Sequence, residues 1–187
     1  GPPAEAHPLA AVALPDPARR AAVARLLAKD LRCPPSSGLG RLFDAAAALL
    51  GLVLVNHHEA MSGMRLETEA VRAGGGPPGT GVVPLQAPGD RGTPAGRLPP
   101  AGARGGEAGN ATGTLLPFEA DTRALLSRTL ELLGQGAGPG AVAWFFHDAL
   151  ADALARGAER AREQTGLATV GLTGGVFLNG LLVERLL

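Results

Sequence analysis

The chain has 187 residues, a length typical of one domain or of part of one. Hydrophobic residues make up 45% of it and charged residues 18%, which is the composition of a globular protein rather than a disordered one. The formal net charge is +0, so the strongly basic surface that would favour nucleic acid or an anionic membrane as a partner is excluded.

A single cysteine, Cys33, excludes a disulfide framework and a cysteine-rich zinc site within this chain, and it is compatible with a reducing cytoplasm. No apolar run is long enough for a transmembrane helix. The chain starts at Gly1 without a methionine or a signal-peptide pattern, and its last residues have a helical pattern that is still in progress at Leu187. We therefore expect a cytoplasmic protein and a chain that is part of a longer one.

A stretch rich in glycine and proline divides the chain. Residues 73–113 hold 13 Gly and 7 Pro, and such a segment cannot bury enough apolar surface to offset its loss of conformational entropy. The sequence thus predicts three parts of one truncated domain: an N-terminal part (1–72), a flexible, disordered insertion (73–113) and a C-terminal part (114–187). The two outer parts are expected to share one core.

In the N-terminal part, three helices are predicted. The first covers 17–31, because Asp16 and Pro17 are a typical N-cap and first helical residue. The second covers 39–50, and the third covers 58–72, with an extended segment at Leu52–Val55 between them. Apolar stripes on the first two helices are formed by Val23, Leu26, Leu27 and Leu31, and by Leu39, Leu42, Phe43, Ala46, Leu49 and Leu50.

In the C-terminal part, helices are predicted over Ala120–Leu133, Pro139–Gln164 and Val176–Leu187. The longest of them has a stripe that should be buried: Val142, Phe145, Phe146, Ala149, Leu150, Ala153 and Leu154. Ala168–Leu172 is apolar and follows a glycine, which indicates a buried strand.

Thr173-Gly174-Gly175 would then join a strand to a helix. Two glycines let a backbone approach a ligand closely, and a helix N-terminus directly after them would present free N–H groups to a phosphate. The segment has neither the spacing of a Walker A loop nor the GxGxxG pattern, so a simple tight turn is the alternative interpretation.

The segment from Ser36 to Asp44 is a second candidate. Gly40 and Asp44 are one helical turn apart on the same face, so Gly40 could admit a sugar while the Asp44 carboxylate binds its hydroxyls. The alternative is that Ser37 caps the helix, Gly40 packs against a neighbour and Asp44 is solvated.

The histidines give weaker evidence for a functional site. His57 and His58 point to different helix faces, and Met61 or Ser62 stands where a third metal ligand would be needed, so they are interpreted as surface residues. His147, at the edge of an apolar stripe, is interpreted as a structural histidine. No residue is assigned as a catalytic group or a metal ligand, and Cys33 shows no sign of being a nucleophile.

Four segments together resemble the HypF family of [NiFe]-hydrogenase maturation carbamoyltransferases. Residues 33–51 resemble its "SSxGRLFDAxAALLG" segment, and residues 58–67 fall where the family has "YEGQAAMxLE". Residues 143–151 are similar to "AxxFHxxLA", and residues 172–186 to "LSGGVFQNxLLxERL". The motifs occur in family order at roughly family spacing, which is more specific than any one of them alone.

The resemblance implies part of the C-terminal carbamoyl-transfer domain, with an α/β fold of the actin/sugar-kinase/Hsp70 (ASKHA) type. In that family the carbamoyl group of carbamoyl-adenylate, made from carbamoyl phosphate and ATP, passes to the C-terminal cysteine of a partner protein, where it becomes cyanide ligand for the hydrogenase iron. By motif match, Gly40 and Asp44 would contact the ribose, Gly174 and Gly175 the phosphate, and Asn179 the base or ribose.

The chain departs from the family pattern in several places. The family's zinc- or iron-binding histidine run and its later aspartate are absent, so no metal ligand is expected here, and the chain alone is expected to be inactive. Thr173, Leu178 and Gly180 replace the usual Ser, Gln and Arg, while His58, Ala60 and Met61 replace Tyr, Gly and Gln. Two alternatives stay open: a small-molecule O-carbamoyltransferase of the same fold, and a non-catalytic nucleotide-binding paralogue.

Overall fold

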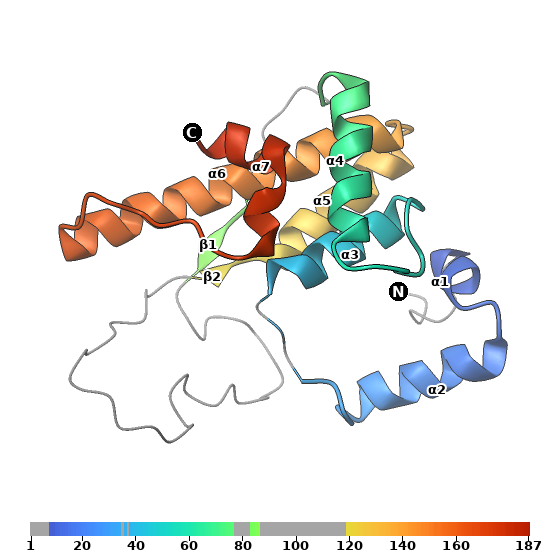
Figure 1. The fold of residues 1–187 in the computed structure, drawn as a ribbon. Helices are drawn as coiled ribbons and strands as arrows, with labels where there is room; N and C mark the ends of the chain where they lie inside the picture. Colours follow the sequence, from blue (N-terminus) through green and yellow to red (C-terminus); the bar gives the residue numbers. More distant parts are fainter. Residues whose placement is uncertain (1–7, 35, 37, 77–82, 87–118) are drawn as a thin grey trace.

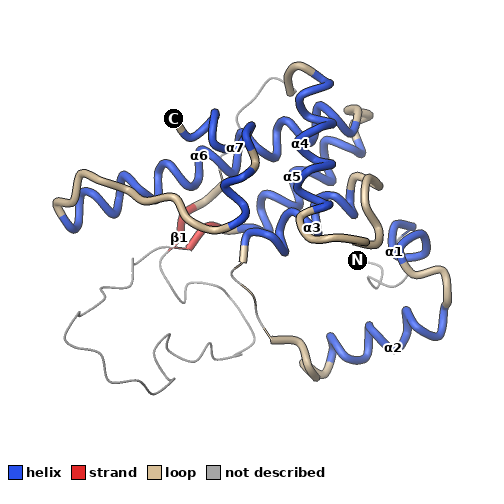
Figure 2. The backbone as a smooth tube through the Cα atoms, viewed as in Figure 1, coloured by secondary structure: helices blue, strands red, loops and turns tan. Residues whose placement is uncertain are grey.

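The computed structural model describes residues 8–34, 36, 38–76, 83–86 and 119–187. Its element order is α1 (Pro8–Ala13), α2 (Pro17–Ala28), α3 (Leu39–Leu49), α4 (Met61–Ala73), β1 (Leu85–Gln86), β2 (Glu119–Ala120), α5 (Thr122–Gly134), α6 (Pro139–Thr165), the 3-10 helix η2 (Gly175–Leu178) and α7 (Gly180–Leu186). The described part of the chain is therefore mostly helical (Figures 1 and 2). None of its helices is long and apolar enough to cross a membrane.

The long helix α6 organises the core. Helices α4, α5 and α7 pack against it, and α3 packs against α4 and α5 (Figure 1). The apolar stripes predicted for 39–50 and for Pro139–Gln164 face this core and supply a large share of its buried side chains, so both predictions are confirmed. The core holds Leu42, Phe43, Ala46, Ala47, Leu50, Leu66, Ala70, Leu125, Val142, Phe145, Phe146, Ala149, Leu150, Ala153 and Leu182 among others.

Helices α4 and α6 approach each other closely at Gly140. A Cβ atom on Gly140 would lie 2.7 Å from the backbone oxygen of Glu69 and 3.0 Å from the Cβ of Ala73, which is closer than real side chains come. Only a residue without a side chain allows this helix crossing, and small residues such as Ala70 and Ala143 are fully buried in the same core.

Helices α1 and α2 lie to one side of this body (Figure 1). The N-cap prediction is confirmed, because the Asp16 carboxylate accepts a hydrogen bond from the Ala18 backbone N–H at 2.8 Å. The predicted helix ends early, at Ala28, and buries no residue. Its expected apolar stripe is exposed, with Leu27 at 62% and Leu31 at 51%. The apolar periodicity therefore predicted the helix correctly, but it did not predict that the apolar side chains are exposed.

Part of the range 73–113 is described. Val83 is buried in the core, its backbone oxygen accepts a 2.6 Å hydrogen bond from Arg156, and Leu85 pairs with Ala120 in the antiparallel β1–β2 ladder. Residues 77–82 and 87–118 lie outside the described residues, and the predicted flexibility of the insertion falls largely there.

Neither the extended segment predicted at Leu52–Val55 nor the strand predicted at Ala168–Leu172 forms a β-strand. Leu52–Val55 is an irregular loop in which only Val53 is buried, and Ala168–Leu172 is an exposed loop, with Val170 at 56% and Leu172 at 45%. A strand needs a neighbour to complete its backbone hydrogen bonds, and β1–β2 is the only ladder among the described residues. Of the expected α/β fold, the described residues therefore show the helices, and the one ladder among them is antiparallel.

Candidate functional site

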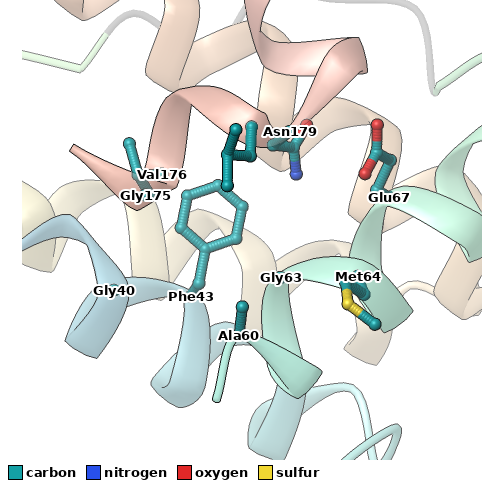
Figure 3. Close-up of a pocket in the computed structure, with 10 residues that line it drawn as sticks. Gly40, Phe43, Ala60, Gly63, Met64, Glu67, Gly175, Val176 and Asn179 are labelled. Atoms are coloured by element: carbon teal, nitrogen blue, oxygen red, sulfur yellow. The ribbon is translucent and has the colours of Figure 1, made fainter. Parts of the chain in front are cut away.

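A pocket of about 230 Å³ lies between α3, α4 and the segment that contains η2 and the start of α7 (Figure 3). Its walls are mostly apolar, with Phe43 and Met64 as the large side chains, and Glu67 supplies a carboxylate. The lining residues are Gly40, Phe43, Ala60, Gly63, Met64, Glu67, Gly175, Val176, Leu178 and Asn179.

The pocket brings together residues from both outer parts of the chain. Gly40 comes from the first turn of α3, whereas Gly175 and Asn179 lie more than a hundred residues later. Three of the five predicted binding residues therefore share one cavity. Asp44 and Gly174 do not line it, although each is on a segment that does.

The Asp44 carboxylate is engaged with its own neighbourhood. Its Oδ1 atom accepts a 2.8 Å hydrogen bond from Nδ2 of Asn56, and the Asn56 Oδ1 atom accepts one of 2.9 Å from the buried hydroxyl of Ser62. Its Oδ2 atom lies 2.7 Å from Nη1 of Arg41 as an ion pair, without the geometry of a hydrogen bond. Asp44 thus anchors the loop between α3 and α4 in this structure.

The segment on both sides of Thr173 differs from the predicted order of strand, tight turn and α-helix. Gly174 has a φ of 99°, a conformation that side chains rarely adopt, so a glycine is required there. A four-residue 3-10 helix follows it in place of the first part of the predicted helix Val176–Leu187. Gly175 has open space where a Cβ would stand.

Two side chains cap the start of α7. Oδ1 of Asn179 accepts a 2.9 Å hydrogen bond from the Leu182 backbone N–H, and Oε1 of Glu67 accepts one of 3.1 Å from the Leu181 N–H. A Cβ on Gly180 would lie only 3.1 Å from that same Glu67 oxygen, so the glycine that replaces the family's arginine leaves room for the carboxylate. The N–H groups of Leu181 and Leu182 are therefore not free to bind a phosphate.

His147 lies directly behind this cap. Its ring is fully buried, and it packs edge-on against Phe43 and Phe146 with ring centroids 5.5 and 5.9 Å away. Nδ1 lies 2.7 Å from the Ala143 backbone oxygen, and Nε2 lies 3.0 Å from Nδ2 of Asn179. Burial lowers the pKa of His147 below its usual 6.5, and this outweighs the hydrogen bond to Ala143 and the nearby acidic groups that raise it. The interpretation of His147 as a structural histidine is confirmed.

Glu67 is the residue that sequence reasoning missed. It lines the pocket and caps α7, yet in the sequence it is one of three glutamates between residues 59 and 69. The final glutamate of the "YEGQAAMxLE" resemblance was the available signal, because it singles out Glu67 among them.

His57 and His58 are exposed on the α3–α4 loop, and Nδ1 of His58 lies 3.1 Å from the Glu59 backbone oxygen. Within the described ranges, no three His, Cys, Asp or Glu side chains gather as they would around a metal ion. The thiol of Cys33 donates to the Leu31 backbone oxygen at 3.3 Å.

The fold and its pocket define a helix-rich unit with a candidate ligand site, and comparison with known proteins gives its family. Residues 4–187 match the family described as "Carbamoyltransferase, Kae1-like Domain, second subdomain". The chain belongs to this family of carbamoyltransferase subdomains. The resemblance inferred from the four motifs is thereby confirmed.

Several similar proteins are named as HypF carbamoyltransferases. The chain is 36% identical over 162 residues to a "Carbamoyltransferase HypF homolog" of Cupriavidus necator, covering 86% of this chain and 34% of that protein. It is 33% identical to "Carbamoyltransferase HypF" of Rhodobacter capsulatus, covering 84% and 16%, and 26% identical to "Probable carbamoyltransferase HypF" of Methanocaldococcus jannaschii, covering 86% and 17%. The chain thus spans between 16% and 34% of the length of these relatives.

A solved structure has the same fold. The crystal structure of full-length HypF in its phosphate- and nucleotide-bound form superposes with a TM-score of 0.67 at 20% identity, covering 94% of this chain and 23% of that one. At this identity the match supports a shared fold.

Proposed function

We propose that this chain supplies part of the nucleotide site of a protein carbamoyltransferase. The observation that carries the proposal is the pocket in which Gly40 of one part of the chain meets Gly175 and Asn179 of the other. The chain's membership of a carbamoyltransferase family gives the reaction class.

In the proposed reaction, carbamoyl-adenylate made from carbamoyl phosphate and ATP donates its carbamoyl group to the C-terminal cysteine of a partner protein that serves hydrogenase maturation. The cysteine sulfur attacks the carbamoyl carbon and a C–S bond forms. The C–O bond to the phosphate breaks, AMP leaves with the electron pair, and the thiol proton goes to solvent. The thiocarboxamide is then the precursor of the cyanide ligands. We place this reaction in the cytoplasm.

The chemistry of the pocket suits the uncharged end of a nucleotide better than its phosphates. Glu67 and Asn179 lie at one end, where a carboxylate and an amide can bind hydroxyl or amino groups (Figure 3). Gly40 and Gly175 lie at the other, where the absence of side chains lets a ligand approach the backbone. A phosphate therefore fits near Gly174 and Gly175 and away from Glu67.

The pocket holds only part of such a ligand. Sites for whole small molecules are about 300–1,000 Å³, and this one is about 230 Å³. The remaining contacts would come from the rest of the complete protein, for which we propose the ASKHA-type architecture. The described residues do not fit the zinc or iron that the resemblance implies, since no set of three ligands gathers among them. No step is assigned to a metal here.

A matched pair of glycine variants tests the proposal. Gly175 and Gly171 both have ordinary backbone conformations and open space for a side chain, but only Gly175 lines the pocket. In the full-length protein, Gly175→Val should abolish carbamoyl transfer to a cysteine-ended acceptor, while Gly171→Val should leave it unchanged. Equal rates in the two variants would refute the assignment. Gly174 is unsuitable for this test, because its φ of 99° makes any substitution strain the turn.

A second pair separates ribose binding from loop anchoring at Asp44. If the carboxylate binds ribose, Asp44→Ala should weaken nucleotide binding by roughly ten- to hundredfold, the loss expected for a charge-assisted hydrogen bond. Asn56→Ala removes the loop partner of Asp44 and leaves the carboxylate in place. Equal losses in both variants would make Asp44 a loop anchor only.

The carbamoyl-transfer assay of the glycine variants, combined with the nucleotide-binding measurement, also distinguishes the two alternative functions. A small-molecule O-carbamoyltransferase would transfer the group to a hydroxyl and not to the acceptor cysteine. A non-catalytic paralogue would bind nucleotide without any transfer.

A further inference from the structure

A buried row of hydrogen bonds joins α6 to the pocket wall. It runs from the Ala143 backbone oxygen through the His147 ring and the Asn179 amide to the backbone N–H of Leu182, with distances of 2.7, 3.0 and 2.9 Å. The side chains of His147 and Asn179 are both buried, so the row is shielded from water.

The two backbone ends fix the direction of every bond in the row. A carbonyl oxygen can only accept, so Nδ1 of His147 must carry a proton and donate to Ala143. A backbone N–H can only donate, so Oδ1 of Asn179 must face Leu182 and its Nδ2 must face the ring. Nε2 of His147 is then the acceptor between them and carries no proton.

We propose that His147 is a positioning residue, which in its neutral form with the proton on Nδ1 holds the Asn179 amide as the cap of α7 and thereby fixes the wall of the pocket. The consequence for ligand binding rests on the proposed nucleotide site, whereas the protonation state of the ring does not.

A second proton on His147 breaks the row whichever way the amide turns. An Nε2–H group would face the Asn179 NH₂ group, which is also a donor. If the amide rotated by 180°, its oxygen would accept from the ring, but its NH₂ group would then face the Leu182 N–H. One buried donor is left without an acceptor in either case, and the α7 cap is weakened.

The surroundings of the ring favour the neutral form. Two acidic groups act on it, Glu67 from α4 and Asp148 from α6 itself, and Asp148 is paired with Arg185 of α7 at 3.2 Å. From α3 the ring meets the uncharged Phe43. Burial outweighs the acidic groups and lowers the pKa.

The direct test is nitrogen NMR of the full-length protein labelled with ¹⁵N-histidine, because the shifts of Nδ1 and Nε2 report which of them is protonated. The His147 signals are assigned by their absence in His147→Gln. At pH 7 we expect Nδ1 protonated and Nε2 unprotonated. In Asn179→Asp, a carboxylate oxygen replaces the amide NH₂ group, and the ring should become doubly protonated at the same pH. A wild-type ring that carries its proton on Nε2, or that is charged at pH 7, overturns the proposal.

The positioning role has its own readout. Gln at position 147 can still accept from Asn179 but does not titrate. Wild type should bind an ATP analogue more weakly as the pH falls, whereas His147→Gln should bind it within about threefold of wild type at pH 7 and should lose this pH dependence. His147→Leu, without an acceptor, should bind about tenfold more weakly. An unchanged pH profile in His147→Gln contradicts the role. If no variant, including wild type, binds nucleotide while the NMR result holds, the proposed function fails and the hydrogen-bond assignment stands.

Discussion

Oε1 of Glu67 accepts a hydrogen bond from the backbone N–H of Leu181 at 3.1 Å, and this bond joins residues that are 114 positions apart. The first lies on α4 before the glycine- and proline-rich range, and the second lies at the start of α7 after it. Because α7 has only seven residues, its first N–H groups are a large share of its backbone donors. The tertiary cap from Glu67 and the local N-cap Asn179 satisfy two of them. The two outer parts of the chain therefore depend on each other where they form the pocket.

This cap predicts a difference between two glutamates of the same helix. Glu67→Ala should lower the free energy of unfolding by about 1.5–3 kcal/mol, because it removes a hydrogen bond to a charged acceptor. Glu69→Ala removes an ion pair with Arg72, whose side chain is 67% exposed, and should cost less than about 1 kcal/mol. Urea denaturation of both variants measures the difference. Equal losses would mean that the bond to Leu181 contributes nothing specific.

The helix crossing at Gly140 predicts a second contrast. Gly140→Ala places a Cβ 2.7 Å from the Glu69 backbone oxygen and should destabilise the fold by about 1–3 kcal/mol through overpacking. Gly134, the last residue of α5, has open space at the same position, so Gly134→Ala should be neutral or stabilising by up to about 1 kcal/mol. The same denaturation experiment compares them. A harmless alanine at 140 would show that α4 and α6 do not pack this closely.

The lowered pKa of His147 predicts a pH dependence of stability. Burial, the largest cause of the shift, favours the neutral ring in the folded state. Between the lowered folded pKa and the unfolded value of 6.5, the unfolded chain binds more protons, so unfolding becomes easier as the pH falls. Stability should be constant above 6.5 and should then decline by up to about 1.4 kcal/mol per pH unit until the folded pKa is reached.

Denaturation between pH 5 and 8 measures this slope, with His147→Gln as the variant that should lose it and His57→Gln, on an exposed loop, as the control that should keep it. A decline of the same size in His147→Gln would assign the pH dependence to other groups.

Local signals in the sequence were sufficient for most of the helices. Asp16 caps its helix as its position indicates, and Asp121 caps α5 in the same way. Pro139 starts α6, and Gly166 in the left-handed conformation ends it. These features depend on neighbours within one or two turns. The stripe of α6 predicted its buried face because that helix runs through the centre of the core.

The failures have one physical cause, which is dependence on distant partners. Ala168–Leu172 has the composition of a strand, but a ladder must be completed by another segment, and the sequence does not say which. The apolar residues of α2 likewise predict a buried face only if something lies against it. Glu67 was missed because its importance arises from α7, far along the chain.

The candidate site was predictable in part. Gly40 and Gly175 were predicted as binding residues because they lack side chains, and both line the same cavity. The role of Asn179 as a cap, and the engagement of Asp44 with Asn56, depend on side-chain geometry that spacing cannot provide. The contacts of both residues with a nucleotide stay predictions.

The measurement that tests the central claim most directly is photoaffinity labelling of the full-length protein with an azido-adenine nucleotide, followed by peptide mapping. If the two outer parts of the chain form one nucleotide pocket, label should appear both in the peptide that contains Gly63 and Met64 and in the one that contains Leu178 and Asn179. Excess unlabelled ATP and Gly175→Val should remove the label from both peptides, and Gly171→Val should remove it from neither. Label confined to segments outside these two peptides, or label in them that Gly175→Val leaves intact, would contradict the account.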